Sequence, residues 1–170
     1  LGAIEFSAPD ESSGSDAIAV AASIVAEADT TFSHIANSTD MVFKLGSTTA
    51  AIEKLRLHHS GDLELVDGGL YVKNSGFSTG AALYLQNTDT AITNGEAIGG
   101  IHFSAPNEAG GTDAITTAAS IVAEADATFA ADNNETDLVF KLGESGAASE
   151  VMRLEHEGNL IITADSADSN

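Results

Sequence analysis

Apolar and polar side chains alternate along several short stretches of the chain, with the two-residue period of half-buried β-strands. Near the start, Ile4, Phe6 and Ala8 share one face. The same alternation recurs in four later sets, which are Met41, Phe43 and Leu45; Leu55 and Leu57; Leu138, Phe140 and Leu142; and Met152 and Leu154. Turn-forming tripeptides such as SGD, DGG, TNG and EGN separate the stretches. The pattern predicts a mostly β protein, of the kind found in fibres and sandwiches.

The alanine-rich phrase AASIVAEAD, at 21–29 and again at 118–126, is open to two interpretations. Alanine is the strongest helix former, and Asp16 could cap a helix that begins after it. One alternative is therefore a β-rich repeat with short Ala-rich helices at 17–29 and 114–126. The other is a pair of strands in the same places.

The distribution of large apolar side chains favours the strands. In a helix, Ile24 would lie roughly 240° round from Ile18, so the two could not share a stripe. In an extended chain Ile18 and Ile24 lie on one face, with Ser23 and Glu27 on the other. We therefore predict strands, in which Ile24 and Ile121 take equivalent core positions.

The chain contains two copies of one module, offset by 97 residues when Ile4 is placed over Ile101. About six positions in ten are identical over the first 63 residues of the alignment, without a gap. We divide the chain into module 1 at 1–66 with a truncated lead-in, an inter-module β segment at 67–98 that leads into module 2, module 2 at 99–165, and a tail at 166–170. Because the first copy lacks the lead-in of the second, we expect the chain to be a window from a longer array.

Charge and composition exclude several classes of partner. The chain has 6 Lys and Arg residues against 26 Asp and Glu, a formal net charge of -20, so nucleic acid and anionic lipid surfaces would be repelled. No apolar run is long enough for a membrane span, so we expect no membrane insertion. Trp is absent and aromatic residues are only 5%, so each chain buries little apolar surface and is expected to need partner chains.

Both copies resemble the shaft modules of bacteriophage tail-fibre and related virion fibre proteins. The residues that carry the resemblance are Ile4, Phe6, Ile24, Phe43, Glu53, Arg56 and Leu57 in the first copy, with Ile101, Phe103, Ile121, Leu138, Phe140, Glu150, Met152, Arg153, Leu154, Gly158 and Asn159 in the second. The resemblance implies tandem β-rich modules in an elongated, interleaved, parallel homotrimeric fibre, with a receptor-binding end elsewhere. The family's closing E-R-M-R-I and G-N-V-G-I-G appear here as EKLRL and EVMRL, and as GDLELVDG and GNLIITAD, so we expect a mid-shaft segment.

Candidate chemistry is sparse. No catalytic motif occurs, so we expect no enzyme, no catalytic residues, no cofactor and no metal ligands. His59 and His156 are equivalent, and a surface or turn-supporting role is favoured over a metal layer on a trimer axis. The acidic loops at 10–16 and 107–113 could hold Ca²⁺, but solvated turns are favoured because a calcium loop's fixed carboxylates are missing.

Arg56 and Arg153 recur beside Glu53 and Glu150 at the same spacing. Residues three apart in a regular strand point to opposite faces, so an ion pair would have to form between neighbouring chains or strands rather than within one strand. We predict an interchain contact from each arginine to a carboxylate.

Three functions remain open from the sequence. The first is a structural component of a bacteriophage virion fibre, the shaft of a tail or head fibre that supports host attachment. Its partners would be further copies of itself in a homotrimer, other fibre or baseplate proteins, and a host surface glycan contacted through a part outside this chain. The alternatives are a bacterial adhesin stalk or filament subunit, and a fibre-embedded polysaccharide depolymerase. The first places the protein extracellularly on the virion, and the second on a bacterial cell surface.

Overall fold

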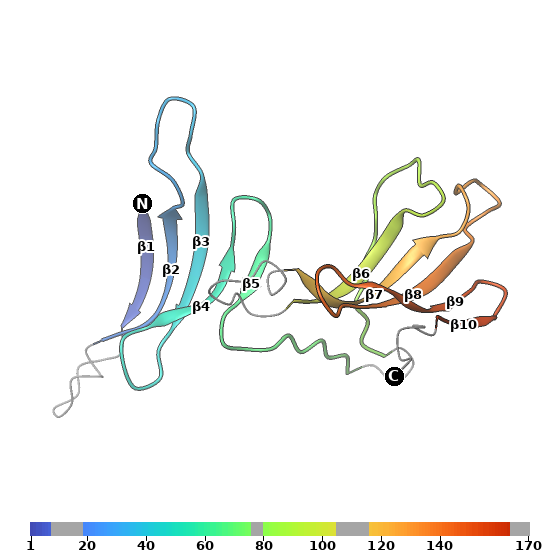
Figure 1. The fold of residues 1–170 in the computed structure, drawn as a ribbon. Coiled ribbons are helices and arrows are strands. Elements are labelled where there is room, and N and C mark those ends of the chain that lie inside the picture. Colours follow the sequence, from blue (N-terminus) through green and yellow to red (C-terminus); the bar gives the residue numbers. More distant parts are fainter. Residues whose placement is uncertain (8–18, 76–79, 105–115, 164–170) are drawn as a thin grey trace. The chain divides into compact units, whose positions relative to one another are not determined.

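The computed structural model describes residues 1–7, 19–75, 80–104 and 116–163, which fall into two units, Leu1–Ala81 and Ala82–Asn170 (Figure 1). Each unit contains one five-stranded antiparallel sheet whose strands are neighbours in chain order. The first sheet contains β1 (Gly2–Ser7), β2 (Val20–Ala28), β3 (Thr39–Leu45), β4 (Ile52–Leu57) and β5 (Leu63–Leu65). The second contains β6 (Ala97–Ser104), β7 (Thr117–Ala125), β8 (Thr136–Leu142), β9 (Ser149–Leu154) and β10 (Leu160–Ile162). The prediction of a mostly β protein is confirmed.

The alanine-rich phrases form the second strand of each sheet. β2 is paired on both sides, so that Ile24 lies between Ile4 of β1 and Phe43 of β3. The alternative with helices at 17–29 and 114–126 is wrong over the part of these ranges that the structure describes. Hydrogen bonding and packing with two neighbouring strands outweigh the helix preference of alanine, because that preference over other ordinary residues is less than about 1 kcal/mol per residue.

Strand register gives each sheet one charged face and one apolar face. We define the charged face of the first sheet by Glu5, Ser23, Val25, Glu27, Asp40, Val42, Lys44, Glu53, Arg56 and Glu64. The apolar face comprises Ile4, Phe6, Ala22, Ile24, Ala26, Met41, Phe43, Leu45, Ile52, Leu55, Leu57, Leu63 and Leu65. These side chains are hydrocarbons, aromatic rings or a thioether, and the same face carries two hydroxyl groups at strand ends, those of Ser7 opposite Val20 and Thr39 opposite Ala28. The second sheet has the same pairing in β7 to β9.

The largest fully buried side chains lie on the charged face. Val42 and Val139 are 0% exposed, and Asp40 and Asp137 are 2% exposed. Ile24 and Ile121 occupy equivalent positions, as predicted, but they lie on the apolar face and are only half-buried in the single chain. The side chains that one chain buries by itself therefore lie on the face opposite Ile24 and Ile121, and side-chain size alone does not indicate which face the chain buries. A core position for Ile24 and Ile121 between chains stays a prediction.

A β-bulge interrupts the alternation in β4 and again in β9. Phe43 pairs with Leu55 and Lys44 pairs with Glu53, so Lys54 is the extra residue between them. Val151 is the extra residue of β9. The carbonyl groups of these two residues accept hydrogen bonds from the backbone beyond the next strand, at 3.0 and 2.9 Å. A bulge shifts the phase of a strand by one residue, so side chains on either side of it change faces relative to a regular strand.

The segment before β6 packs on the second sheet. A Cβ atom placed on Gly99 would lie 2.9 Å from the Cβ atom of Leu85, so Leu85 fits where the glycine leaves room. Ile92 is buried, and its carbonyl oxygen accepts a 3.0 Å hydrogen bond from the backbone of Phe129. The described residues between β5 and β6 include no assigned strand.

Candidate functional site

Arg56 holds together an ion cluster on the charged face of the first sheet. Its guanidinium nitrogens lie 2.6 Å from Glu53 Oε2, 2.9 Å from Asp40 Oδ2 and 3.0 Å from Glu27 Oε2. Lys44 Nζ adds a 2.8 Å contact to Glu27 Oε1. Three strands, β2, β3 and β4, contribute side chains to the site, and the turn that follows β4 contributes a backbone N–H, so the cluster depends on these three strands being paired.

The second sheet repeats the cluster around Arg153. Its nitrogens lie 2.6 Å from Glu124 Oε1, 2.7 Å from Asp137 Oδ2 and 2.7 Å from Glu150 Oε2. Lys141 Nζ is 3.8 Å from Glu124 Oε2, 1 Å further than its counterpart in the first sheet. Lys44, Arg56, Lys141 and Arg153 are four of the chain's 6 basic residues. The sparse positive charge is therefore concentrated in these two clusters.

The expectation that Arg56 and Arg153 cannot pair with the glutamate of their own strand is wrong, whereas the expected contacts to neighbouring strands are present. A contact to a carboxylate of a neighbouring chain stays a prediction. Both arginines bind carboxylates of their own chain, including the glutamate three residues earlier in the same strand. The β-bulge explains the difference, because Lys54 and Val151 each add one residue and bring Glu and Arg to the same face. A regular two-residue period, assumed in the sequence analysis, cannot reveal this.

The clusters keep their acidic members ionised. The pKa of Asp40 is lowered to about 2, first by the backbone N–H of His59 and then by Arg56. Burial alone would raise the pKa of Asp137, but hydrogen bonds from Arg153 and His156 outweigh it and lower that pKa below its ordinary value. Glu53 and Glu150 raise the pKa of Arg56 and Arg153, with the other carboxylates of each cluster adding to the effect. The carboxyl groups whose pKa is lowered in this way, among them Asp40, Glu53, Asp137 and Glu150, are ionised at neutral pH.

His59 and His156 lie in the turn that follows β4 and β9. Their backbone N–H groups donate to Oδ1 of Asp40 and Asp137, at 2.9 and 3.0 Å. The Nδ1 atom of each histidine also lies within 3.5 Å of carboxylate oxygens from two aspartates. A turn-supporting role agrees with the sequence analysis. The contacts to two aspartates each were not predicted, because the partners lie more than fifteen residues away in sequence.

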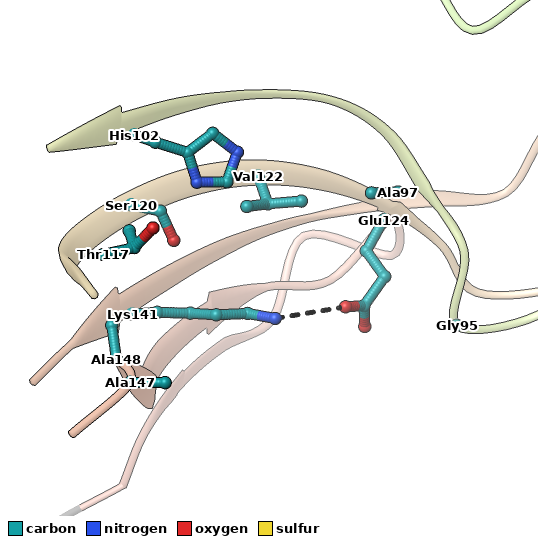
Figure 2. A pocket seen from close by; sticks show the side chains of 10 residues that line it. All are labelled: Gly95, Ala97, His102, Thr117, Ser120, Val122, Glu124, Lys141, Ala147 and Ala148. Carbon is teal, nitrogen blue, oxygen red and sulfur yellow. Dashed lines mark ion pairs between the residues drawn. The ribbon is translucent and has the colours of Figure 1, made fainter. Parts of the chain in front are cut away.

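Two other histidines and the acidic loops do not enlarge the site. His34 and His102 have no histidine at the equivalent position of the other copy, where Ala131 and Glu5 stand. His102 lines a shallow groove of about 270 Å³ on the second sheet (Figure 2). The Lys141 and Glu124 side chains point toward each other in this groove, and Ser120 lies beside Thr117, nearer to His102. The proposed calcium loops at 10–16 and 107–113 lie outside the described residues.

The apolar face is exposed in the single chain. On the first sheet Phe43 is 37% exposed and Phe6 is 54% exposed, and Ile4, Met41, Leu45, Ile52, Leu57, Leu63 and Leu65 are exposed as well. The second sheet exposes Ile101, Phe103, Leu138, Leu142, Leu154, Leu160 and Ile162 in the same way. Monomeric proteins seldom present an uninterrupted apolar face of this size to water, whereas interaction surfaces do. This face is the strongest candidate for a functional surface.

The fold of the chain, with its two antiparallel meanders, is similar to the fold of solved phage tail-fibre domains. The particular structures that share it are two of the carboxy-terminal domain of the bacteriophage T5 L-shaped tail fibre. The first has a TM-score of 0.64 and 13% sequence identity, covering 100% of this chain and 81% of that chain. The second, which includes an intra-molecular chaperone domain, has a TM-score of 0.63 and 14% identity, covering 100% of this chain and 56% of that chain.

These likenesses confirm, at the level of the fold, the resemblance to tail-fibre proteins found in the sequence. No protein-family model and no curated protein matches the sequence. Among the described residues, no helix is long and apolar enough to cross a membrane.

Proposed function

We propose that this chain is a non-enzymatic structural component of a bacteriophage virion fibre, in which it supports host attachment. The single observation that carries the proposal is the exposed apolar face, since a five-stranded sheet with one predominantly apolar face needs a covering layer. The tail-fibre fold supports the same reading. The fibre would lie on the outside of the virion, joined to other fibre or baseplate proteins, with any host glycan contacted by a part outside this chain.

Copies of the same chain are the proposed cover, arranged as a parallel homotrimer with the apolar faces directed inward. The distribution of charge supports this direction. In a chain of net charge -20, charged faces turned toward one another would repel, whereas apolar faces carry no charge to oppose association. Burial of apolar surface contributes about 25 cal/mol per Å², and this face is the largest source of such surface in each unit.

The oligomeric state in solution tests the proposal. Light scattering coupled to size exclusion should give three chains per particle for the wild-type protein. Phe43→Glu together with Phe140→Glu places charges on both apolar faces and should yield monomers or aggregates. Phe32→Glu is the matched control, because Phe32 is also exposed but lies in the β2 to β3 connection and not on the sheet. A folded wild-type monomer would contradict the proposal.

The location on the virion needs a separate measurement. A bacterial adhesin stalk could use the same apolar face, and the tail-fibre fold favours the virion. Antibodies raised against the chain should decorate fibres of purified phage particles in electron micrographs. Decoration of uninfected bacterial cells would instead support the adhesin, and release of sugar from a capsular polysaccharide by the purified chain would support the depolymerase.

A further inference from the structure

Each unit brings one histidine and two aspartates together at the end of its ion cluster. In the first unit, His59 Nδ1 lies 3.4 Å from Asp29 Oδ2 and 3.5 Å from Asp40 Oδ1. In the second unit, His156 Nδ1 lies 3.4 Å from Asp126 Oδ2 and 3.5 Å from Asp137 Oδ1. All three donor atoms of each group lie within 4.8 Å of one another. We call these the Asp-Asp-His triads.

The distances are those of ligands around a common ion. An N–H···O hydrogen bond is usually about 2.7–3.2 Å long, and a single Nδ1 proton cannot be directed at two oxygens on separate residues. A tetrahedral ion with bonds of about 2.0–2.2 Å holds neighbouring ligand atoms about 3.3–3.6 Å apart. The separations of 3.4 and 3.5 Å in both units fall inside that interval.

The two copies keep the triad and change its surroundings. All three positions are identical between the copies, although about four positions in ten differ over the aligned region. The histidine directly before the triad histidine is not retained, since His58 becomes Glu155. His58 also contacts carboxylates, Glu64 at 3.0 Å and Asp40 at 3.4 Å, and its side chain is less exposed than that of His59, yet the second copy keeps a histidine only at the position of His59. The difference between these adjacent positions indicates a requirement at His59 and His156 specifically.

The arginine clusters orient the buried aspartate of each triad. Arg56 binds Oδ2 of Asp40 at 2.9 Å, which leaves Oδ1 directed toward His59. Arg153 binds Oδ2 of Asp137 at 2.7 Å in the same way. Supporting contacts of this kind fix the direction of a metal-binding carboxylate. The outer aspartate of each triad, Asp29 or Asp126, has its side chain 42% exposed, so water can reach the open position.

We propose that each unit binds one Zn²⁺ ion through its Asp-Asp-His triad, with water as the fourth ligand. The donors are Asp29 Oδ2, Asp40 Oδ1 and His59 Nδ1 in the first unit, and Asp126 Oδ2, Asp137 Oδ1 and His156 Nδ1 in the second. One imidazole nitrogen with two carboxylate oxygens suits zinc, whereas Ca²⁺ and Mg²⁺ take oxygen ligands and avoid imidazole. Binding requires the lone pair of Nδ1, so a protonated imidazole releases its proton to solvent as the ion enters. The ion would join the β2 to β3 connection to the turn after β4.

Zinc uptake by the full chain tests this proposal. Calorimetry with zinc chloride at neutral pH, with excess Ca²⁺ present to occupy ordinary surface carboxylates, should give two ions per chain. His59→Gln with His156→Gln should lose at least about tenfold in affinity, since even the loss of a supporting residue costs that much. The matched control is His34→Gln with His102→Gln, which removes the same number of histidines and should leave both sites intact.

Three results would overturn the proposal. They are no zinc uptake by the wild-type chain under excess Ca²⁺, equal uptake by the His59 and His156 double variant, and equal loss in the control. If the double histidine variant does not fold, Asp29→Asn with Asp126→Asn changes only exposed turn side chains and should weaken binding as strongly. Cobalt added to the wild-type chain gives an independent measure of the coordination number through its visible absorption. Intense visible bands of a four-coordinate ion are expected, and the weak bands of a six-coordinate ion would contradict the site.

Discussion

The first and second units carry the same ion cluster but cover their sheets differently. In the second unit, the segment before β6 lies on the sheet, with Leu85 against Gly99 and Ile92 buried. Ala125 at the end of β7 is 1% exposed there, whereas the equivalent Ala28 of β2 is exposed. The charged face is thus complete within five strands in either unit, while the apolar face gains cover from a segment outside the sheet.

This difference separates the ion cluster, which each sheet forms from its own strands, from the cover on the apolar face, which residues outside the sheet supply. Every partner of Arg56 or Arg153 comes from its own sheet, so the cluster is a property of the module. Leu85 and Ile92 come from the segment of the second unit that precedes β6, so their contacts depend on residues outside the sheet. Changes in the clusters should therefore affect the two units equally, and changes in that segment should affect the second unit alone.

The largest effect is expected from the arginines. Arg153→Met leaves the buried Asp137 without its cation and should destabilise the second unit by about 3 kcal/mol, because an unpaired buried charge is costly. Arg56→Met should produce a loss of similar size in the first unit. Hydrogen exchange of peptides from β3 and β8, read by mass spectrometry, reports each unit separately. Clearly unequal losses of stability in the two units would show that the two ion clusters do not contribute equally.

Truncation of the buried valines is the next test of equivalence. Val42→Ala and Val139→Ala each remove two methyl groups from positions that are 0% exposed. Each substitution should cost on the order of 2 kcal/mol in its own unit and leave the other unchanged. Denaturant unfolding with the same exchange measurement provides the comparison. A loss in only one unit would show that the two charged faces are packed differently.

Gly99→Ala and Gly2→Ala sharpen the difference between the units. The new methyl group at position 99 would lie 2.9 Å from the Cβ atom of Leu85, and we expect destabilisation of about 1–2 kcal/mol from overpacking. The equivalent Gly2 has no heavy atom within 4 Å of that point, so its substitution should change stability by less than about 0.5 kcal/mol. Thermal unfolding of the two variants is the measurement. Equal effects would mean that Leu85 does not cover the second sheet in solution.

The smallest effect is expected from the lysines. Lys44 lies 2.8 Å from Glu27, but Lys141 lies 3.8 Å from Glu124. Lys44→Met should cost about 0.5 kcal/mol at low salt, and Lys141→Met less, because partly exposed pairs are screened. Unfolding at low and at high salt should show the difference between the variants shrinking as salt rises. A larger loss for Lys141→Met would contradict the distances.

The strands could be predicted from the sequence, and the burial within them could not. The two-residue period located β3, β4, β8 and β9, and the position of Ile24 decided between strand and helix for β2. The period gives the two faces of a strand but does not say which face the chain covers for itself. Val42 and Asp40 are buried because Arg56 and its carboxylates close over that side, and these residues come from three strands.

The sequence identified the Arg and Glu residues of the ion clusters, but it did not predict that they contact each other within one strand. The repeated Glu53 and Arg56 spacing identified the right pair, but the bulge at Lys54 has no signature in a single sequence, so the pair was assigned to opposite faces. The Asp-Asp-His triads depend on three separate segments of each unit, and only the fold brings these segments together.

The bulged residue also bears on how accurately a chain of repeated modules can fold. Without it, β4 could shift by one residue against β3 and present its leucines to the charged side. The unpaired position fixes one alignment, and its side chain is free to differ, as Lys54 and Val151 do. Each module thereby carries its own reference point for alignment. A register error in one sheet therefore need not change the register of the other sheet. This independence matters most when the two sheets have nearly the same sequence.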